Sequence, residues 1–328
     1  FRHNHSTTQA LIEVTEKVRD AIDSGQYAAG VFIDLQKAFD TVDHSILLAK
    51  LNYYGIRGTP LKWFRSYLTN RKQFVSINET KSITNPITIG VPQGSIIGPL
   101  LFIIYINDLH VSIKHSDVYH FADDTNLQLI TSSLNKLNRK MNHDLANLVQ
   151  WLRANKISLN SKKTKLILFH TQMTNFNKQN NNCLKKNLNF RISGQKLFPS
   201  KEIEYLGITI DDNLKFKKHI NDLTLKLSRA NGMIAKIGHF ENLETLLCIY
   251  HAIFGSHIRY ACQVWAQAKR TDLDKIVILQ NKAMRLIFFQ PKDFSCNILY
   301  YLAKILKFSD MVQFNYCLFV WDQQNSVL

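Results

Sequence analysis

Cysteine, proline and glycine are scarce in this chain of 328 residues, which has 5 cysteines, 6 prolines and 12 glycines. The cysteines are widely scattered without the paired spacing of a zinc finger, and we interpret them as reduced packing residues. No apolar run reaches the roughly 18 residues that span a bilayer. The N-terminus also lacks the charged-then-apolar order of a secretion signal. We therefore expect an intracellular protein that makes no use of a membrane.

Acidic residues are few in the second half of the chain. Residues 1–150 hold 15 Lys and Arg against 13 Asp and Glu, whereas residues 151–328 hold 26 against 12, so the net charge of +16 is concentrated downstream. Such an excess attracts polyanions and favours a nucleic acid over a small substrate. The alternative is a solvated basic face that has no partner.

The hydrophobic pattern predicts a mixed body followed by a helical region. Hydrophobic residues make up 45% of the chain, enough for a sizeable core and two or three subdomains. Strands mixed with helices, followed by helices alone from Leu214, indicate the α+β class with an all-α appendage. The Asn-, Gln- and Lys-rich residues 171–189 indicate an exposed loop. Helices are expected over 6–24, 44–54, 60–68, 100–109 and 134–152. Strands are expected over 28–34, 190–193 and 203–210, as two short strands within 118–130, and within 157–169, where a basic loop leads into a strand that ends at Phe169. Two further strand-like runs are 73–78 and 83–89, with Asn85-Pro86 interrupting the second.

Two acidic positions stand at the ends of predicted strands. Asp123 and Asp124 interrupt the alternating apolar residues 118–130, which indicates a hairpin that bends at the two carboxylates. Asp34 ends the apolar run 28–33. Adjacent acids repel each other and add no favourable cross-strand contact, so a cation or a cationic partner is the natural explanation. Together with Asp34 they suggest a divalent-metal site at the end of a sheet. The simpler alternative is an ordinary turn, in which aspartate is common.

Five motifs occur in a fixed order along the chain. They are residues 31–42 (VFIDLQKAFDTV), 90–95 (GVPQGS), 121–124 (FADD), Leu159-Asn160 with Lys163-Thr164, and 205–208 (YLGI). In this order and spacing they closely resemble the reverse transcriptases of non-long-terminal-repeat retrotransposons, of the jockey-like branch. Residues 259–265 and 279–285 resemble the region that follows the polymerase in such elements.

The resemblance implies a right-hand polymerase fold, with a palm built on a ferredoxin-like antiparallel sheet. Residues 1–30 are then a remnant of the fingers, and residues 31–213 form the palm, with an insert at 44–90. Residues 214–328 form a helical thumb and connection. The chain looks truncated at the fingers, since the upstream finger motifs are missing.

The resemblance also implies a two-metal site for Mg²⁺, with Mn²⁺ as a substitute. Asp34, Asp123 and Asp124 match the metal-binding carboxylates, and the backbone carbonyl of Leu35 adds a ligand. Two ions help a primer 3′-hydroxyl attack an incoming triphosphate and steady the pyrophosphate. Asp40, like Asp43, is better explained by a first-turn helix position, where negative charge is favoured.

Further residues match the family's nucleotide site. Phe39 matches the aromatic that excludes a ribose 2′-hydroxyl, although a core aromatic is an equal alternative from the residues alone. Gln93 and Gly94 would contact nucleotide or template, and Lys163 the triphosphate. Arg2 resembles a finger arginine that also contacts the triphosphate. Basic residues of the thumb would grip phosphates of an RNA–DNA hybrid: Lys215, Lys217, Lys218, Lys226, Arg229 and Lys236.

The resulting expectation is an RNA-directed DNA polymerase core that uses an RNA template, a DNA primer and dNTPs. It would act in the nucleus or cytoplasm as a ribonucleoprotein. One rival is an inactive relic of such an element that still binds nucleic acid. A second rival, a ferredoxin-like sheet that binds RNA by stacking, is disfavoured by the acids at the turn.

Overall fold

The computed structural model describes residues 6–169 and 188–325, which form two compact units. The first, which we call the sheet unit, comprises residues 21–200. The second, the helical unit, combines residues 2–20 with residues 201–328. The predicted loop at 171–189 falls almost wholly outside the described residues. No helix in the part of the chain that the structure describes is long and apolar enough to cross a membrane.

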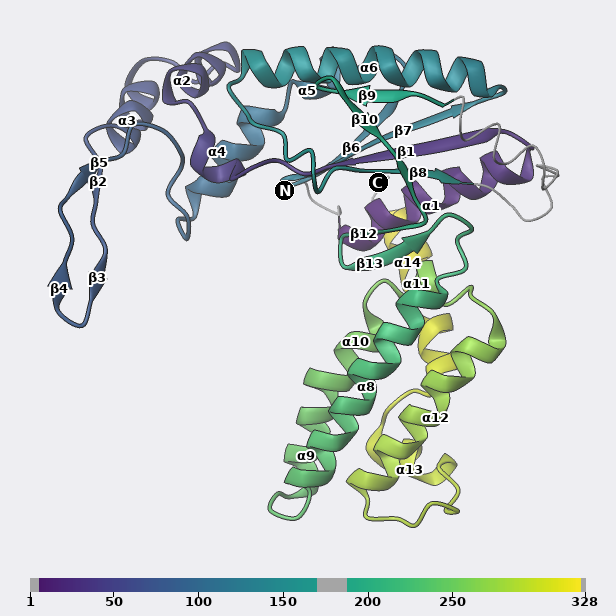
Figure 1. The fold of residues 1–328 in the computed structure, drawn as a ribbon. Helices are drawn as coiled ribbons and strands as arrows, with labels where there is room; N and C mark the ends of the chain where they lie inside the picture. Colours follow the sequence, from purple (N-terminus) through teal and green to yellow (C-terminus); the bar gives the residue numbers. More distant parts are fainter. Residues whose placement is uncertain (1–5, 170–187, 326–328) are drawn as a thin grey trace. The chain divides into compact units, whose positions relative to one another are not determined.

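The sheet unit is built on five strands in the order β11-β8-β1-β7-β6 (Figure 1). The central strand β1 pairs antiparallel with both neighbours, β7 and β8, and only the short β11 runs parallel to its partner. β1 is central because its residues 28–33 are all buried, as a continuous apolar run requires. The strands span β1 Tyr27–Ile33, β6 Asp117–Phe121, β7 Asp124–Thr131, β8 Lys165–Phe169 and β11 Pro199–Ser200.

Helix α6 (Leu134–Ala154) supplies much of the core of the sheet unit. Its buried side chains recur every three or four residues, as an amphipathic helix requires, and they join the buried residues of β1 and β7 in one cluster. Ser133 begins the helix by accepting a hydrogen bond from the Lys136 amide. The hairpin β9 (Phe190–Ile192) and β10 (Gln195–Leu197) packs against α6. The buried residues of α6 are Leu137, Met141, Asp144, Leu145, Leu148 and Leu152.

The segment between β1 and β6 holds helices and a long exposed ribbon. Strand-like runs were predicted over 73–78 and 83–89, with Asn85-Pro86 interrupting the second. The structure differs, since Asn85-Pro86 is itself a paired strand and the runs are otherwise shorter. The structure has four strands of two residues each, because every residue from 69 to 86 is exposed and no face is fixed by burial. The elements are η1 Ala38–Thr41, α2 His44–Tyr53, α3 Gly58–Leu68, β2 Lys72–Gln73, β3 Ser76–Ile77, β4 Thr80–Lys81, β5 Asn85–Pro86, α4 Ile97–Ile106 and α5 Leu109–Ser112.

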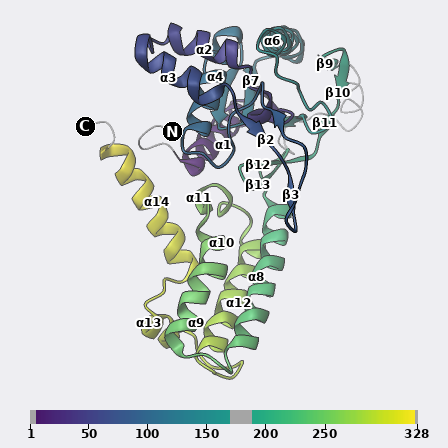
Figure 2. The ribbon, with the colours of Figure 1, turned by 90° about the vertical axis from the view of Figure 1, so that its left-hand side faces the viewer.

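In the helical unit, α8 packs along α12, while α9 and α10 run beside them (Figure 2). Asn231 of α8, which is buried, donates to the Leu279 carbonyl of α12 at 3.0 Å. The predicted strand 203–210 is a hairpin instead, broken where Leu206 and Gly207 take positive φ angles of 46° and 76°. The elements are α1 Thr7–Asp23, whose last residues lie in the sheet unit, β12 Glu202–Tyr205, β13 Ile208–Asp211, α8 Lys217–Ile237, α9 Leu243–Ile249, η2 Tyr250–Gly255, α10 Ser256–Arg259, α11 Cys262–Trp265, α12 Arg270–Ile287, α13 Asn297–Ala303 and α14 Phe308–Asn325.

The α+β class, with an all-helical region after residue 214, is thereby confirmed for the described residues. The helices predicted over 6–24, 44–54, 60–68 and 134–152 are present with bounds shifted by a few residues. The exception is α4, which begins three residues before its predicted start and ends at Ile106, with the short α5 following it.

Candidate active site

The sheet places Asp34 and Asp124 at the same end of neighbouring strands. β1 and β7 are antiparallel, and their last paired residues at this end are Ile33 and Thr125. Asp34 directly follows Ile33, and Asp124 directly precedes Thr125. One further step of the same register sets the two aspartates opposite each other, at the about 5 Å Cα separation of an antiparallel pair. Two residues far apart in the sequence are therefore neighbours here.

Asp123 lies in the tight turn that joins β6 to β7. Phe121 and Asp124 are the last pair of this hairpin, so Ala122 and Asp123 alone make the turn. Ala122 has a φ of 53°, the left-handed conformation that two-residue hairpin turns demand. Asp123 and Asp124 are exposed, while Asp34 is half-buried. The predicted hairpin with carboxylates at its bend is confirmed.

A loop after α6 is held against the backbone of Asp34. The Asn160 amide donates to the Asp34 carbonyl at 2.9 Å, and the Asp34 amide donates to Thr164 Oγ1 at 3.3 Å. Thr164 Oγ1 in turn donates to the Asn160 carbonyl at 3.0 Å. Lys163 lies in this loop with its side chain exposed. The structure thus brings the loop that carries Lys163 next to the backbone of Asp34.

The backbone of Leu35 is oriented by the same loop. Leu35 and Leu159 form an antiparallel bridge whose hydrogen bonds are Gln36 N to the Ser158 carbonyl, at 2.8 Å, and Asn160 N to the Asp34 carbonyl. In a bridge of this kind the carbonyl of the central residue points away from the partner strand. The Leu35 carbonyl therefore faces the β7 side of β1, on which Asp124 lies.

The donor set of this sheet end suits a hard divalent ion. Three carboxylates and one peptide carbonyl are all oxygen ligands, which Mg²⁺ prefers. Within the described residues these three carboxylates do not form a compact cluster of potential metal ligands. Three carboxylates repel one another, and drawing them together takes a cation. The residue types and their placement fit such an ion.

A compact group of potential metal ligands is found elsewhere, at His115, His143 and Asp144. Asp144 is fully buried, and its carboxylate already accepts hydrogen bonds from the amides of Lys114, His115 and Ser116 at 2.7–3.1 Å, and from Ser116 Oγ at 2.8 Å. The oxygens of Asp144 therefore hold the loop that precedes β6. This group is explained by the fold, without an ion.

Phe39 lies in the 3-10 turn η1, and hydrogen bonds join this turn to the glycine-rich loop. Its ring is half-buried and contacts that of Phe102, with centroids 4.8 Å apart. The Val91 amide donates to the Phe39 carbonyl at 2.9 Å, and the Gly90 amide to the Val42 carbonyl at 2.8 Å. Phe39 is thus a partly buried aromatic whose backbone is bonded to the glycine-rich loop, in the segment that follows Asp34.

Gln93 and Gly94 form the exposed tip of this loop. Gln93 Nε2 donates to Asp40 Oδ1 at 2.8 Å, so an acid that the sequence assigns to a helix turn also positions Gln93. Gly94 has a φ of 78°, which favours glycine, and no atom lies near enough to meet an added Cβ. Asp40 lies 53 residues from Gln93, which is why sequence reasoning missed this contact.

Asp43, by contrast, is a structural residue. It is the N-cap of α2, where Oδ1 accepts from the amides of Ser45 and Ile46 at 2.9 and 3.0 Å. Lys156 Nζ lies 2.7 Å from Oδ2. The hydrogen bonds from Lys156 and Ser45 hold the pKa of the Asp43 carboxyl well below its usual range. The helix-start explanation of Asp43 is confirmed in substance, at the cap instead of the first turn.

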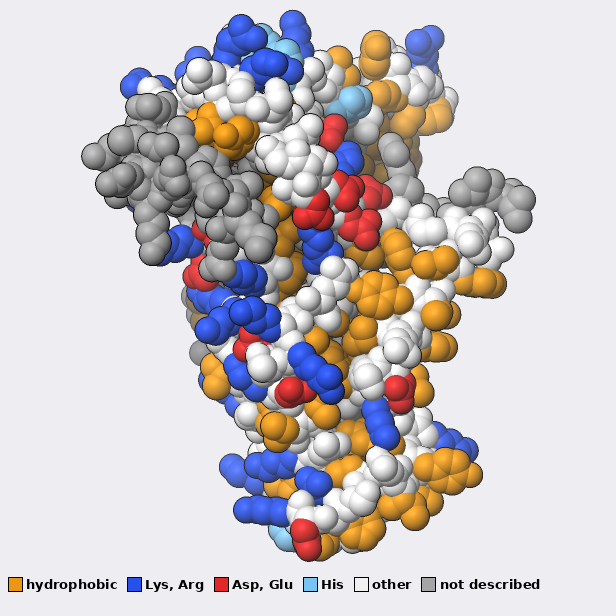
Figure 3. All heavy atoms as spheres, turned by 90° about the vertical axis from the view of Figure 1, so that its right-hand side faces the viewer, with side chains coloured by type: hydrophobic (Ala, Val, Ile, Leu, Met, Phe, Trp, Pro, Cys, Tyr) orange, Lys and Arg blue, Asp and Glu red, His pale blue; other side chains and the backbone are white. Residues whose placement is uncertain are grey.

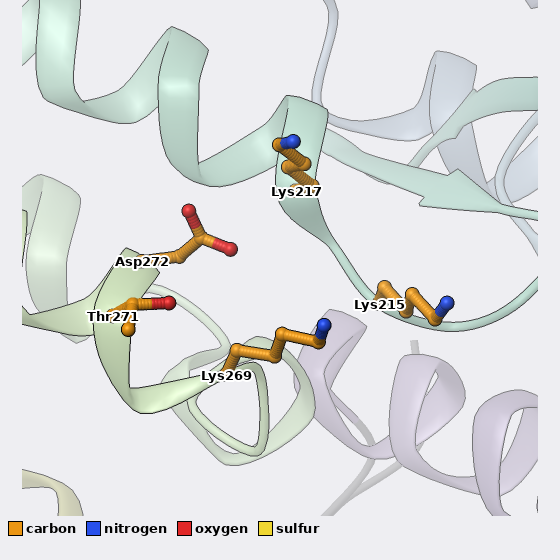
Figure 4. A pocket seen from close by; sticks show the side chains of 5 residues that line it. All are labelled: Lys215, Lys217, Lys269, Thr271 and Asp272. Atoms are coloured by element: carbon orange, nitrogen blue, oxygen red, sulfur yellow. The ribbon is translucent and has the colours of Figure 1, made fainter.

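In the helical unit, a cavity of about 300 Å³ opens where α8 and α12 begin. Three lysines, Lys215, Lys217 and Lys269, are among the residues that line it (Figure 4). Thr271 and Asp272 complete the lining, and Asp272 is engaged by Lys275 Nζ at 2.8 Å. Lys215 and Lys217 were predicted from the sequence. Lys269 and Thr271 were missed, because they lie more than 50 residues downstream.

The other basic residues predicted to bind nucleic acid lie along α8. Lys226, Arg229 and Lys236 are exposed, whereas Lys218 is paired with Glu202. On the face of the helical unit seen in Figure 3, Lys and Arg side chains are more numerous than Asp and Glu side chains. Arg2, the predicted finger arginine, lies outside the described residues.

Comparisons with known proteins identify relatives of this chain. The chain is 30% identical over 308 residues to the RNA-directed DNA polymerase from mobile element jockey of Drosophila melanogaster, and this match covers 89% of the chain and 32% of that protein. It is 28% identical to the probable RNA-directed DNA polymerase from transposon BS of the same species, covering 88% of the chain and 32% of the relative. The chain thus spans about a third of the length of these relatives.

Among solved structures, telomerase from Candida albicans in complex with a fragment of telomeric RNA is similar at 13% identity and a TM-score of 0.42. The match covers 92% of this chain and 56% of the telomerase chain. For apo telomerase from Candida tropicalis the identity is 12% and the TM-score 0.45, and the match covers 92% of this chain and 50% of the telomerase chain. The family model for reverse transcriptase (RNA-dependent DNA polymerase) matches residues 1–210. The chain therefore belongs to the reverse transcriptase family, and its named relatives are polymerases of mobile elements.

Proposed function

We propose that this chain is the polymerase core of a non-long-terminal-repeat retrotransposon, and that it extends a DNA primer on an RNA template with dNTPs. The observation that carries the proposal is the register of β1 and β7, which sets Asp34 beside Asp124 and the turn residue Asp123. The match of residues 1–210 to the reverse transcriptase family supplies the reaction class. By the same proposal residues 31–213 are the palm, with the insert 44–90, residues 1–30 a part of the fingers, and residues 214–328 the thumb and connection.

Asp34, Asp123 and Asp124, with the Leu35 carbonyl, are the proposed ligands of Mg²⁺, for which Mn²⁺ is a substitute. A divalent ion held by these oxygens neutralises charge on the attacking 3′-hydroxyl and on the leaving pyrophosphate. The half-buried Asp34 has its backbone fixed on both its amide and its carbonyl. Its carboxylate is thereby presented from a rigid strand end, as catalytic preorganisation requires.

The neighbouring residues are proposed to hold the nucleotide. Phe39, fixed against Phe102, would leave no room for a 2′-hydroxyl, which selects dNTPs over ribonucleotides. Gln93 has its amide nitrogen engaged by Asp40, so its carbonyl oxygen is left to accept a hydrogen bond from nucleotide or template. Gly94 allows close approach of the backbone there. Lys163 would neutralise the triphosphate or protonate the leaving pyrophosphate.

The basic residues of the helical unit are proposed to hold the RNA–DNA hybrid by its phosphates, without reading sequence. Lys215 and Lys217 are the best placed, because Lys269 and two helix N-termini meet them at the same cavity. Lys226, Arg229 and Lys236 extend this contact along α8, whereas Lys218 contributes less because Glu202 already engages it. Arg2 would contact the triphosphate. Because RNA templates and dNTPs are made inside cells, the reaction belongs in the nucleus or cytoplasm, in a ribonucleoprotein.

Primer extension on an RNA template with Mg²⁺ tests this proposal. Asp123→Asn and Asp34→Asn should each reduce extension by at least about a thousandfold, since each removes a charge that the metal ions need. Asp117→Asn, at the other end of the same hairpin, is the matched control and should extend at the parental rate. Extension that survives in both active-site variants would refute the assignment of the site. An unaltered chain that binds the hybrid but never extends it would favour the inactive relic.

A further inference from the structure

The ribbon of residues 69–86 exposes apolar side chains. Phe74, Val75, Ile77 and Ile83 are 50–81% exposed. In Figure 1 the ribbon projects from α3 and carries β2 to β5. A two-stranded ribbon on its own is at best marginally stable in water, so side chains of this kind are stabilised by whatever binds them.

The charge of this part of the chain points to a polyanion. Residues 51–90 hold six Lys and Arg but a single acid, Glu79. Three of these cations have contacts in the described part of the chain: Arg57 with a backbone carbonyl, and Arg71 and Lys81 with aromatic rings. None of the six forms an ion pair with a carboxylate of the described residues. A partner that matches this surface therefore carries dense negative charge. The six cations are Arg57, Lys62, Arg65, Arg71, Lys72 and Lys81.

Planar side chains are stacked at the base of the ribbon. Trp63 and Tyr67 lie one helical turn apart on α3, with ring centroids 5.5 Å apart and planes 12° apart. The Arg71 guanidinium lies 5.5 Å from the Tyr67 ring centroid and continues the stack by four more residues. Trp63 is 51% exposed, so this ladder has an accessible aromatic end. Aromatic faces with flanking cations are the elements of a single-strand binding surface.

We propose that the ladder Trp63-Tyr67-Arg71, together with the ribbon, binds single-stranded RNA. Bases stack on Trp63, and Lys62, Arg65 and Lys72 contact the phosphates. A duplex is a poorer fit, because its bases are already stacked on one another and offer no free face. The choice of RNA over DNA rests on the proposed function, in which the uncopied template is the unpaired strand.

The ribbon is also connected to the loop that carries Gln93. Its return strand β5 ends at Pro86, four residues before Gly90, and four residues of extended chain span at most about 14 Å. Between them, Ile89 forms a bridge with Asp43, which fixes the chain at that point. RNA held on the ribbon is therefore close to the segment proposed to contact nucleotide and template, while the surface itself is separate from the carboxylates.

Fluorescence anisotropy with a labelled 20-nucleotide RNA, the same sequence in DNA and an RNA–DNA hybrid tests the inference on the full chain. Trp63→Leu should weaken RNA binding about tenfold, as loss of one stacked base implies. Arg65→Gln with Lys72→Gln, which removes two of the proposed phosphate contacts, should lower the slope of log K against log salt by about 1.4. Binding of the hybrid should stay unchanged. The controls are Trp321→Leu and the pair Lys136→Gln with Arg139→Gln, all exposed residues elsewhere.

Each other result overturns a stated part of the inference. If the variants weaken binding of RNA and of the hybrid equally, the surface contacts a duplex. If they weaken binding of RNA and of single-stranded DNA equally, the assignment to RNA is wrong. If they change the affinity for none of the three probes, the surface does not bind nucleic acid and a protein partner is left. Asp123→Asn separates this inference from the proposed function, because it should abolish extension and still bind RNA with parental affinity. Thermal melting of each variant checks that a change in binding is not a loss of folding.

Discussion

Gly90→Ala should destabilise the sheet unit far more than Gly94→Ala, although the two glycines share one loop. Both have positive φ angles, 89° and 78°, which cost an alanine about 1–2 kcal/mol. Only at Gly90 would the new Cβ meet backbone, at 2.9 Å from the Asp40 carbonyl oxygen and 3.0 Å from the Asp40 Cα. At Gly94 nothing lies within 4 Å. The pair therefore isolates the effect of the close contact.

Moving the backbone to relieve the contact at Gly90 would cost free energy, because three hydrogen bonds hold it in place. The Gly90 amide donates to Val42, its carbonyl lies 2.7 Å from His44 Nε2, and the next amide donates to Phe39. Forcing an extra carbon into a packed site costs about 1–3 kcal/mol. We expect losses of about 2–5 kcal/mol for Gly90→Ala and about 1–2 kcal/mol for Gly94→Ala.

Urea unfolding of the two variants measures this difference, and equal losses would refute the reasoning. A second readout follows the link to Phe39. Because the amides at 90 and 91 position the turn that carries this ring, Gly90→Ala should reduce the preference for dNTPs over ribonucleotides in primer extension. Gly94→Ala should leave that preference unchanged. If Gly90→Ala loses stability and keeps full discrimination, the turn does not set the position of Phe39 through these bonds.

Three further predictions concern buried polar groups. Asp144→Asn should cost about 3 kcal/mol in urea unfolding, since an amide accepts fewer of the bonds from residues such as Ser116, and EDTA should not change the melting temperature of the parent. Tyr105→Phe should cost about 1–2 kcal/mol, because the fully buried Tyr105 hydroxyl donates to the Asn155 carbonyl at 2.6 Å. Burial lowers the pKa of His219 from 6.5 to about 4, so the folded state favours the neutral ring. The unfolding free energy should therefore be highest above about pH 6.5. It should fall by on the order of 3 kcal/mol as the pH drops towards 4, because the unfolded state takes up the proton first. His219→Gln should flatten the unfolding free energy between pH 4 and 7, and an unchanged slope would contradict the burial argument.

The parts of the fold that burial determines could be predicted from the sequence. The apolar run before Asp34 gives the central strand, and the spacing from Leu134 to Leu152 gives α6, because both patterns report which face is covered. The position of Asp34 could be predicted for the same reason, since it directly follows the buried strand β1, and the alternating apolar residues around Asp123 and Asp124 predict their hairpin. The ribbon could not, because its residues are exposed on all sides and no periodicity fixes their pairing.

Contacts between distant segments were beyond sequence reasoning. Asp40 has an ordinary role as a turn residue in its local sequence, and its bond to Gln93 exists only because the loop at Gly90 returns to η1. Lys269 belongs to the same cavity as Lys215 only because α8 and α12 begin side by side. Local sequence patterns identify which residues are candidates for a site, whereas their contact partners depend on which distant segments pack together in the fold.

The three carboxylates of the site are held with unequal stiffness. Asp34 ends the innermost strand of the sheet, with hydrogen bonds to a second loop, whereas Asp123 sits in a two-residue exposed turn beside the edge strand β6. Turns at a sheet edge open at lower free energy than central strands. The turn at Asp123 should therefore open more readily than the strand end at Asp34. Hydrogen exchange would register this as faster amide exchange at Asp123 than at Asp34.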